Sequence, residues 1–332
     1  MRVWFKAIAV ISLLLLAPAA NATPIIQTLG PFDVTFYNAG DSDGLYTGSQ
    51  NWTPEQITDV AASIDAWASN IDENPIRNVN MHLFWDELDS LGSNVLGGSA
   101  SVRITDYSSQ WNLGEYVWKN PLDILEDPGT SSYGFDTVIR YDVTAADTNW
   151  NFGSDAPGAG DIDFRSVITH EIGHSLGFDS TYESPTYDDW GWFYTSQTQG
   201  EYYGLSEWDQ HLVDSAGNKP ENGTTGTPDN FNETDDPVYF DGPNAMAVYG
   251  GLVPIYAPNP YQPGSSLSHI DQATFPNYLM SPAISTGSMN RMPSELEWAI
   301  MQDIGWNLTP EPATILLLAI PAVVLATKRK TR

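Results

Sequence analysis

The chain has 332 residues, and 42 acidic against 13 basic residues give it a formal net charge of −29 at pH 7. We expect such an anionic surface to repel nucleic acid and anionic membranes, and to suit solubility or cation binding. Because the chain has no cysteine, it forms no disulfide, and any metal that it binds must be held by His, Asp or Glu.

The first 22 residues have the pattern of a secretory signal peptide. Two basic residues, Arg2 and Lys6, precede an apolar run at 7–17, and the small residues at 20–22 form a cleavage site. An N-terminal membrane anchor is the alternative, but the run is about half of the ~20 residues that a spanning helix needs. Cleavage would leave Thr23–Asn51 at the start of the mature protein, either as a short propeptide or as the beginning of its first lobe.

The elements predicted next are a helix, three strands and a loop. The helix runs from Thr53, a good N-cap, to Ile71, with apolar residues at helical spacing. Apolar and polar residues alternate in Val79–Trp85 and, more weakly, in Ala100–Ile104, and a further strand is predicted at Thr137–Val143. A Gly- and Asp-rich loop, Gly153–Asp163, leads into a second helix. This order indicates an α+β or α/β lobe.

The second helix carries the strongest chemical signal, His170-Glu171-Ile172-Gly173-His174. Residues four apart lie on one helical face, so His170 and His174 can direct both imidazoles at one ion, and zinc accepts this arrangement. Glu171, next to the first histidine, can act as general base and then as general acid. Gly177 follows where a helix can end in a left-handed turn. An amphipathic helix with two unrelated histidines is the alternative.

After Phe178 the chain is rich in Tyr, Trp, Asp, Gly and Pro, with few periodic segments. Helices are predicted at Ser206–Val213 and Pro293–Ile304. The acid-rich stretch Thr227–Asp236 offers hard oxygen ligands for Ca²⁺, but no EF-hand pattern is present, so solvated loop acids are the favoured interpretation.

The C-terminal residues, 310–332, resemble a PEP-CTERM sorting tail. Pro310-Glu311-Pro312 precedes the apolar stretch Ala313–Thr327, which is followed by a basic end. As a helix this stretch would be roughly 22 Å long, short of a ~30 Å hydrocarbon core. The resemblance implies a transient membrane anchor, recognition by an exosortase-type enzyme, and delivery to the cell surface or extracellular matrix of a Gram-negative bacterium. A plain transmembrane tail is the alternative.

The metal motif matches the metzincin pattern HExxHxxGxxH as far as Gly177, but Ser180 stands where that pattern has its third histidine. Three later segments, SSLSHID at 265–271, LMSP at 279–282 and ELEWAIMQDIGW at 295–306, resemble the leishmanolysin type of metzincin. In that family a long insertion precedes the third histidine. The resemblance implies that His269 is the third zinc ligand and that Met280 forms a methionine turn beneath the metal.

The same resemblance implies an α+β, two-lobed metzincin-like fold with a long insertion before the third ligand. The metallopeptidase domain would span residues 23–309, with the N-terminal lobe reaching to about residue 178 and the C-terminal lobe covering 179–309. Leishmanolysin is rich in disulfides, whereas this chain has no cysteine, so a thiol-based latency mechanism cannot operate here.

Other residues compete for the third ligand position. His211 lies on a predicted helix, and Glu201 or Glu207 would serve if the site followed the gluzincin arrangement, in which a downstream glutamate is the third ligand. His82 alternates with apolar neighbours on a predicted strand, so a place in the core or along the cleft is favoured over metal binding.

The sequence therefore predicts a secreted or surface-anchored zinc endopeptidase that acts on a protein or peptide substrate, with Glu171 as the base. Two alternatives remain at this stage. One is a non-catalytic surface or matrix protein that retains the fold, which the intact Glu171 disfavours. The other is a zinc hydrolase that acts on something other than peptides.

Overall fold

The computed structural model describes residues 23–71, 78–88, 95–101, 104–107, 116–119, 135–143, 149–180, 182–183, 192–193, 206–219 and 237–309. The predicted signal peptide, the sorting tail, Glu201 and Thr227–Asp236 lie outside these residues. Within them the protein belongs to the α+β class, with a mixed sheet and helices. No helix in these ranges is both long enough and apolar enough to cross a membrane.

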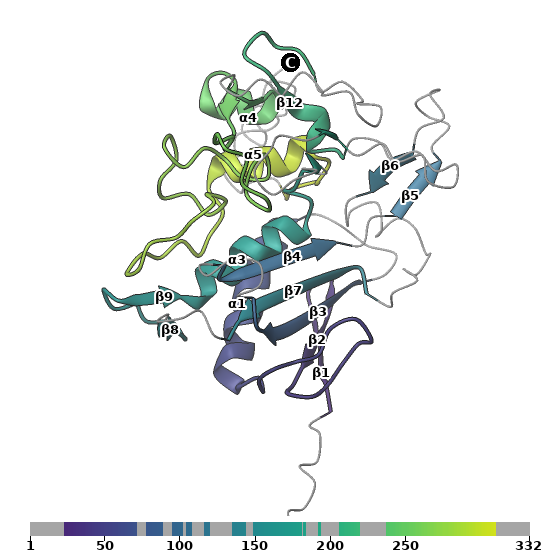
Figure 1. The fold of residues 1–332 in the computed structure, drawn as a ribbon, viewed down its shortest axis with the longest axis vertical. Helices are drawn as coiled ribbons and strands as arrows, with labels where there is room; N and C mark the ends of the chain where they lie inside the picture. The colour runs from purple at the N-terminus through teal and green to yellow at the C-terminus, as the bar shows by residue number, and fades with distance from the viewer. Residues whose placement is uncertain are drawn as a thin grey trace, which may run out of the picture.

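Five strands form the main sheet in the order β1-β2-β3-β7-β4 (Figure 1). Strands β2, β3 and β7 run parallel, whereas β1 and β4 pair antiparallel at the two edges. Residues 23–51 therefore begin the sheet. The strand bounds are β1 (Ile25–Leu29), β2 (Phe32–Tyr37), β3 (Val79–Asp86), β7 (Thr137–Asp142) and β4 (Gly97–Ser101).

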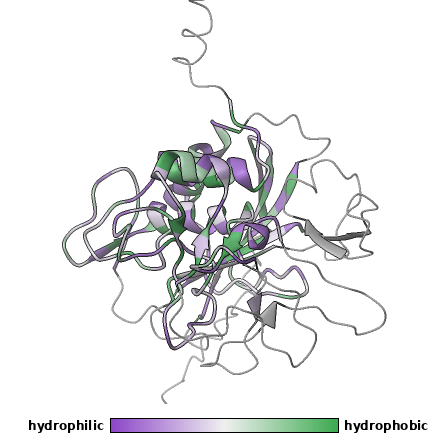
Figure 2. Cartoon of the chain, turned by 90° about the horizontal axis from the view of Figure 1, so that it is seen from above, coloured by the Kyte–Doolittle hydropathy of each residue, from purple (hydrophilic) through white to green (hydrophobic). Residues whose placement is uncertain are grey.

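Two helices, α1 (Pro54–Ala68) and α3 (Phe164–Ser175), pack on one face of this sheet. A capping box between Thr53 and Gln56 starts α1, as the sequence predicted for Thr53. The Trp67 indole donates to the Thr169 carbonyl at 2.8 Å and fixes α1 against α3. Hydrophobic and hydrophilic residues occur within single helices in Figure 2, which is typical of amphipathic helices that bury one face.

Both ends of α3 are defined by specific hydrogen bonds. Asp163 is the N-cap and accepts from the Ser166 backbone N–H at 3.0 Å. At the other end, Gly177 has φ +103°, and the Gly177 and Phe178 N–H groups donate to the His174 and Gly173 carbonyls. This is a Schellman ending, so the prediction that the helix stops at Gly177 is confirmed. The turn brings the chain after α3 back beside His174.

The C-terminal part packs on the other side of α3 (Figure 1). Within it, α4 (Pro243–Tyr249) contacts α5 (Glu295–Asp303). The Trp298 ring lies 5.1 Å from the Trp67 ring, and the Trp306 indole donates to the Leu176 carbonyl at 2.8 Å. One hydrophobic core therefore continues from the sheet through α3 to α5.

The remaining elements are short strands and one 3₁₀ turn. Three two-stranded pairs are β5 with β6, β8 with β9 and β10 with β11, while β12, β13 and β14 form a small sheet. Their bounds are β5 (Ile104–Tyr107), β6 (Tyr116–Lys119), β8 (Asn149–Asn151), β9 (Asp161–Asp163), β10 (Tyr182–Glu183), β11 (Trp192–Phe193), η1 (Asp209–His211), β12 (Leu212–Val213), β13 (Tyr239–Phe240) and β14 (Val253–Pro254).

Three sequence predictions were wrong in type or extent. The helix predicted at Ser206–Val213 is instead η1 followed by β12, because Leu212 and Val213 pair with β13 and this tertiary pairing overrides local propensity. The single strand at Ala100–Ile104 is replaced by β4 and β5, which pair with different partners. The loop predicted at Gly153–Asp163 ends in β9, which pairs with β8.

A buried ion pair fixes the start of α3 and provides a stability test. Asp163 is fully buried and also accepts from the Arg291 guanidinium, with Nε at 2.9 Å. Burial opposes ionisation of Asp163, but hydrogen bonds from Arg291 and Ser166 hold its pKa below the usual range. The D163A change removes both the cap and the partner of Arg291.

We expect D163A to lower the free energy of unfolding by about 3 kcal/mol. This is the lower end of the range for breaking a buried pair, because the Arg291 side chain keeps some contact with solvent. The matched control is D65A, on the exposed face of α1, which should stay within about 0.5 kcal/mol of the parent. Denaturant unfolding measures both, and equal stability of the two variants would show that the Asp163–Arg291 contact contributes little.

Candidate metal centre

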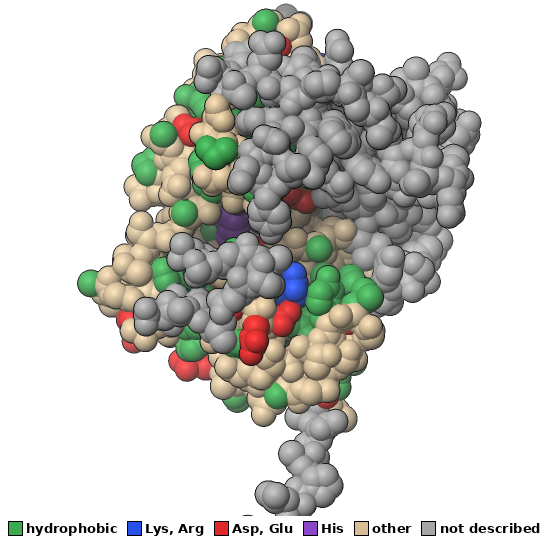
Figure 3. Space-filling view, viewed as in Figure 1, with side chains coloured by type: hydrophobic (Ala, Val, Ile, Leu, Met, Phe, Trp, Pro, Cys, Tyr) green, Lys and Arg blue, Asp and Glu red, His purple; other side chains and the backbone are tan. Residues whose placement is uncertain are grey.

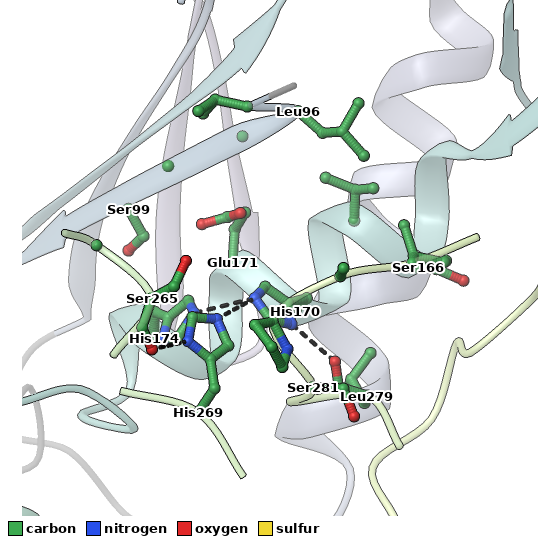
Figure 4. A pocket seen from close by; sticks show the side chains of 18 of the residues that line it. Leu96, Ser99, Ser166, His170, Glu171, His174, Ser265, His269, Leu279 and Ser281 are labelled. Atoms are coloured by element: carbon green, nitrogen blue, oxygen red, sulfur yellow. Dashed lines mark hydrogen bonds between the residues drawn. The ribbon is translucent and has the colours of Figure 1, made fainter. Parts of the chain in front are cut away.

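Three histidine side chains converge beside α3 (Figure 4). His170 and His174 come from α3 at the predicted spacing, and His269 comes from the loop that follows β14. Their Nε2 atoms lie 3.0 Å (170 to 174), 3.1 Å (174 to 269) and 3.2 Å (170 to 269) apart. The structure thus brings together residues that are 95 positions apart in sequence.

The other nitrogen of each ring is held by a backbone carbonyl. Nδ1–H of His170 donates to Leu279, that of His174 to Phe178, and that of His269 to Ser265, at 2.7, 2.7 and 2.8 Å. A neutral imidazole has one donor and one acceptor nitrogen, so all three Nε2 atoms carry lone pairs. Three facing acceptors cannot hydrogen-bond to one another, whereas a cation among them satisfies all three.

The donor set fits a metal ion. Tetrahedral ligands at the usual zinc–nitrogen distance are separated by roughly 3.3 Å, close to the spacing of these Nε2 atoms. Burial, reinforced by His174, lowers the pKa of His170 to about 3, and burial lowers that of His174 to about 4. Burial, with the two neighbouring rings, also lowers the pKa of His269. All three are neutral at pH 7, the form that metals require, so this cluster can bind a metal ion.

The cluster opens into a cleft of about 830 Å³. Figure 3 shows a histidine side chain at the bottom of a hollow in the surface. The cleft is lined on one side by α3, on another by β4, and on a third by the loop at 278–290. Its volume lies within the usual range for binding pockets.

Glu171 lines the same cleft and is 6% exposed. Burial, and then the nearby Asp179 carboxylate, raise its pKa to about 8. A Cβ at Gly97 of β4 would lie 2.9 Å from Glu171 Oε1, so the absence of a side chain at Gly97 makes room for this carboxylate beside the strand. The arrangement places a buried carboxylate between the histidine cluster and the sheet edge.

Met280 lies next to the cluster, on the side of α3 that faces Trp67. Its side chain is fully buried, and a Cβ at Gly173 would lie 2.6 Å from the Met280 sulfur. Gly173, the fourth residue of the metal motif, therefore lets Met280 approach the helix closely. The sequence indicated Met280 through the resemblance to a methionine turn, whereas no sequence signal pointed to Gly173.

Two of the other candidate ligands, His211 and Glu207, lie outside this cluster. Among the described residues, the group able to hold a metal is His170, His174 and His269, and it includes neither His211 nor Glu207. His211 Nδ1 lies 3.2 Å from Asp241, and Nε2 lies 3.1 Å from the Asp303 carbonyl, so it links the end of α5 to the residue that follows β13. His82 is buried on the sheet face opposite α3, and its Nδ1 lies 3.0 Å from Asp43. Of the two places predicted for it, the core or the cleft, it therefore lies in the core.

Sequence reasoning missed the three carbonyl acceptors, because a backbone carbonyl has no residue-type signal. It also missed Gly97, whose only signal was its place in the pair Gly97-Gly98. Comparison with protein-family models, with curated proteins and with solved structures finds no match for this chain.

The role of His269 can be tested against His211, the other histidine downstream of α3. Changing a residue that only orients a metal ligand typically weakens metal binding by ~10–100-fold. Because H269A removes a ligand itself, we expect it to weaken Zn²⁺ binding at least as much. H211A should keep the parent affinity, since His211 contacts Asp241 and Asp303 instead. Competition titration with a chromogenic chelator measures both.

The reverse result would make His211 the ligand and remove His269 from the centre. If both variants kept parental affinity, a carboxylate such as Glu201 or Glu207 would become the candidate.

Proposed function

We propose that this protein is a secreted or surface-anchored zinc-dependent endopeptidase with a metzincin-like organisation of the leishmanolysin type. The observation that carries the proposal is the set of three neutral imidazoles in an open cleft, with the buried carboxylate of Glu171 beside them. A structural zinc site is closed by four protein ligands, whereas a catalytic one keeps a position for substrate or water.

The residues have separate roles in the proposed reaction. Zinc, when bound, polarises the scissile carbonyl and lowers the pKa of water toward about 7. His170, His174 and His269 hold the metal, and Glu171 takes a proton from the attacking water. Glu171 then delivers that proton to the departing amine nitrogen as the C–N bond breaks. The products are a free carboxylate and a free amine.

The sheet edge supports a peptide as substrate. Strand β4 is the last strand of the described sheet, and Gly97, Gly98, Ser99 and Ala100 line the cleft. An edge strand presents unpaired N–H and C=O groups to which an extended peptide can add. A Cβ at Gly98 would meet no atom within 4 Å, so this part of the strand leaves room for a bound chain.

The ends of the sequence support delivery outside the cell. The signal-peptide pattern at 1–22 supports export, and the resemblance of residues 310–332 to a sorting tail supports processing by an exosortase-type enzyme at a Gram-negative cell surface.

A casein or gelatin zymogram with and without a chelator tests the function. We expect a clearing band that disappears with the chelator and returns when Zn²⁺ is added back. A band that resists the chelator would contradict a metallopeptidase. If the protein binds zinc but cleaves no protein substrate, the non-catalytic surface protein or a zinc hydrolase of another class replaces this proposal.

The role of Glu171 is tested by E171Q, which keeps the size of the side chain and removes the base. We expect turnover to fall by about 10²–10⁴-fold, the usual contribution of a positioned acid–base group, while zinc content is unchanged. E55Q, an exposed glutamate in the first turn of α1, is the matched control and should keep parental turnover. Equal rates for E171Q and the parent would remove Glu171 from the mechanism.

A further inference from the structure

Glu297, in the first turn of α5, is a fully buried carboxylate that does not line the cleft. Oε2 accepts from the Ser294 backbone N–H at 2.6 Å, and the Ser294 hydroxyl accepts from the Glu297 N–H, which together form a capping box. Oε1 is not needed for the cap. It accepts from the Met280 backbone N–H, also at 2.6 Å.

The contact with Met280 connects Glu297 to the metal centre. The Met280 N–H and the Leu279 carbonyl belong to the same planar peptide group. The Leu279 carbonyl is the acceptor of His170 Nδ1–H, at 2.7 Å. A continuous path therefore runs from the Glu297 carboxylate through one peptide group to the His170 ring.

This path resembles the carboxylate–histidine pairs of metal sites, in which a carboxylate orients a metal-binding histidine. Such carboxylates usually contact the histidine directly, fixing its tautomer and ring orientation. Here a peptide group stands between them, and the carboxyl oxygen that accepts from its N–H polarises the carbonyl that His170 uses. The second nitrogen of the ring, Nε2, then faces His174 and His269.

Helix capping alone does not explain the burial of Glu297. A glutamate at this position of a capping box needs only one oxygen, and it can stay at the helix surface. Burial raises the pKa of Glu297, which disfavours the charged form, while hydrogen bonds from Ser294 and Met280 oppose that shift. Among the described residues Glu297 belongs to none of the ion pairs, so backbone N–H groups are its main partners.

We propose that Glu297 is a positioning residue for the metal centre, which fixes the His170 ring and its Nδ1–H tautomer through the Leu279–Met280 peptide group. The proposal rests on the zinc site proposed above. The Met280 side chain is held as well, because its sulfur packs against Gly173. The loop is therefore fixed at Met280 through both the backbone N–H and the side chain.

Three variants of the full protein separate positioning from capping. E297Q keeps the shape of the side chain, but its amide NH₂ replaces one acceptor and then faces a backbone N–H. S294A removes the hydroxyl cap and leaves the Glu297–Met280 contact in place. E295Q changes the neighbouring exposed glutamate and is the matched control. Zn²⁺ affinity, the absorption spectrum of the Co²⁺-substituted protein, and the melting temperature are measured for each.

We expect E297Q and S294A both to melt below the parent, because each loses part of the cap. Zn²⁺ affinity should fall ~10–100-fold in E297Q alone, the size of effect typical for groups that orient a ligand. The Co²⁺ spectrum should change in E297Q and stay parental in S294A and E295Q. If E297Q does not fold, E297D decides, since its shorter side chain cannot hold both Ser294 and Met280.

Parental Zn²⁺ affinity in E297Q, or in E297D where E297Q does not fold, overturns the role of Glu297 and leaves the metal centre standing. An equal loss of affinity in S294A and E297Q also overturns it, because capping of α5 would then account for the effect. A parent protein that binds no Zn²⁺ overturns the proposed zinc site and this role with it.

Discussion

The structure around the cleft depends on the orientation of three imidazole rings. Each ring gives its Nδ1–H to a backbone carbonyl, and each therefore turns an acceptor nitrogen toward the other two. Without a cation the three lone pairs repel one another, because the nitrogens lie about 3 Å apart with no proton to share. The hydrogen bonds to the three carbonyls keep the rings in this orientation.

Two of those carbonyls are fixed by contacts at the ends of helices. The Schellman ending of α3 places the Phe178 carbonyl beside His174 one turn after the motif, and the Glu297–Met280 contact holds the loop that carries the Leu279 carbonyl. Buried ion pairs hold the start of the helix. These pairs are Asp163 with Arg291 and Asp59 with Arg165. They place two of the chain's 13 basic side chains in this region. The histidine cluster is therefore held by contacts at both ends of α3 and by the loop that carries Leu279 and Met280.

The chemistry proposed for Glu171 is linked to the same geometry. Burial and Asp179 raise the pKa of Glu171 to about 8 when no cation is present, so the carboxyl group would be mostly protonated at neutral pH. A cation at the histidine cluster favours the ionised form. In the proposed enzyme, metal binding and the readiness of the base are coupled, and a chain without metal has neither the Lewis acid nor a fully ionised base.

The sequence by itself determined the local part of this site. His170 and His174 share a helical face because they are four residues apart, and Gly177 ends the helix because it can adopt φ +103°. The longer elements, α1, β3, β7 and α5, were also predicted from the sequence. Their order left the α+β and α/β classes open, and the α+β class followed from the resemblance to leishmanolysin. What only the tertiary structure decided is non-local. The sequence indicated His269 through a resemblance, but its 3.1 Å approach to His174 is a contact between distant segments. The pairing of Leu212 and Val213 that replaced a predicted helix, and the path from Glu297 to His170, are made through backbone groups that no residue pattern records.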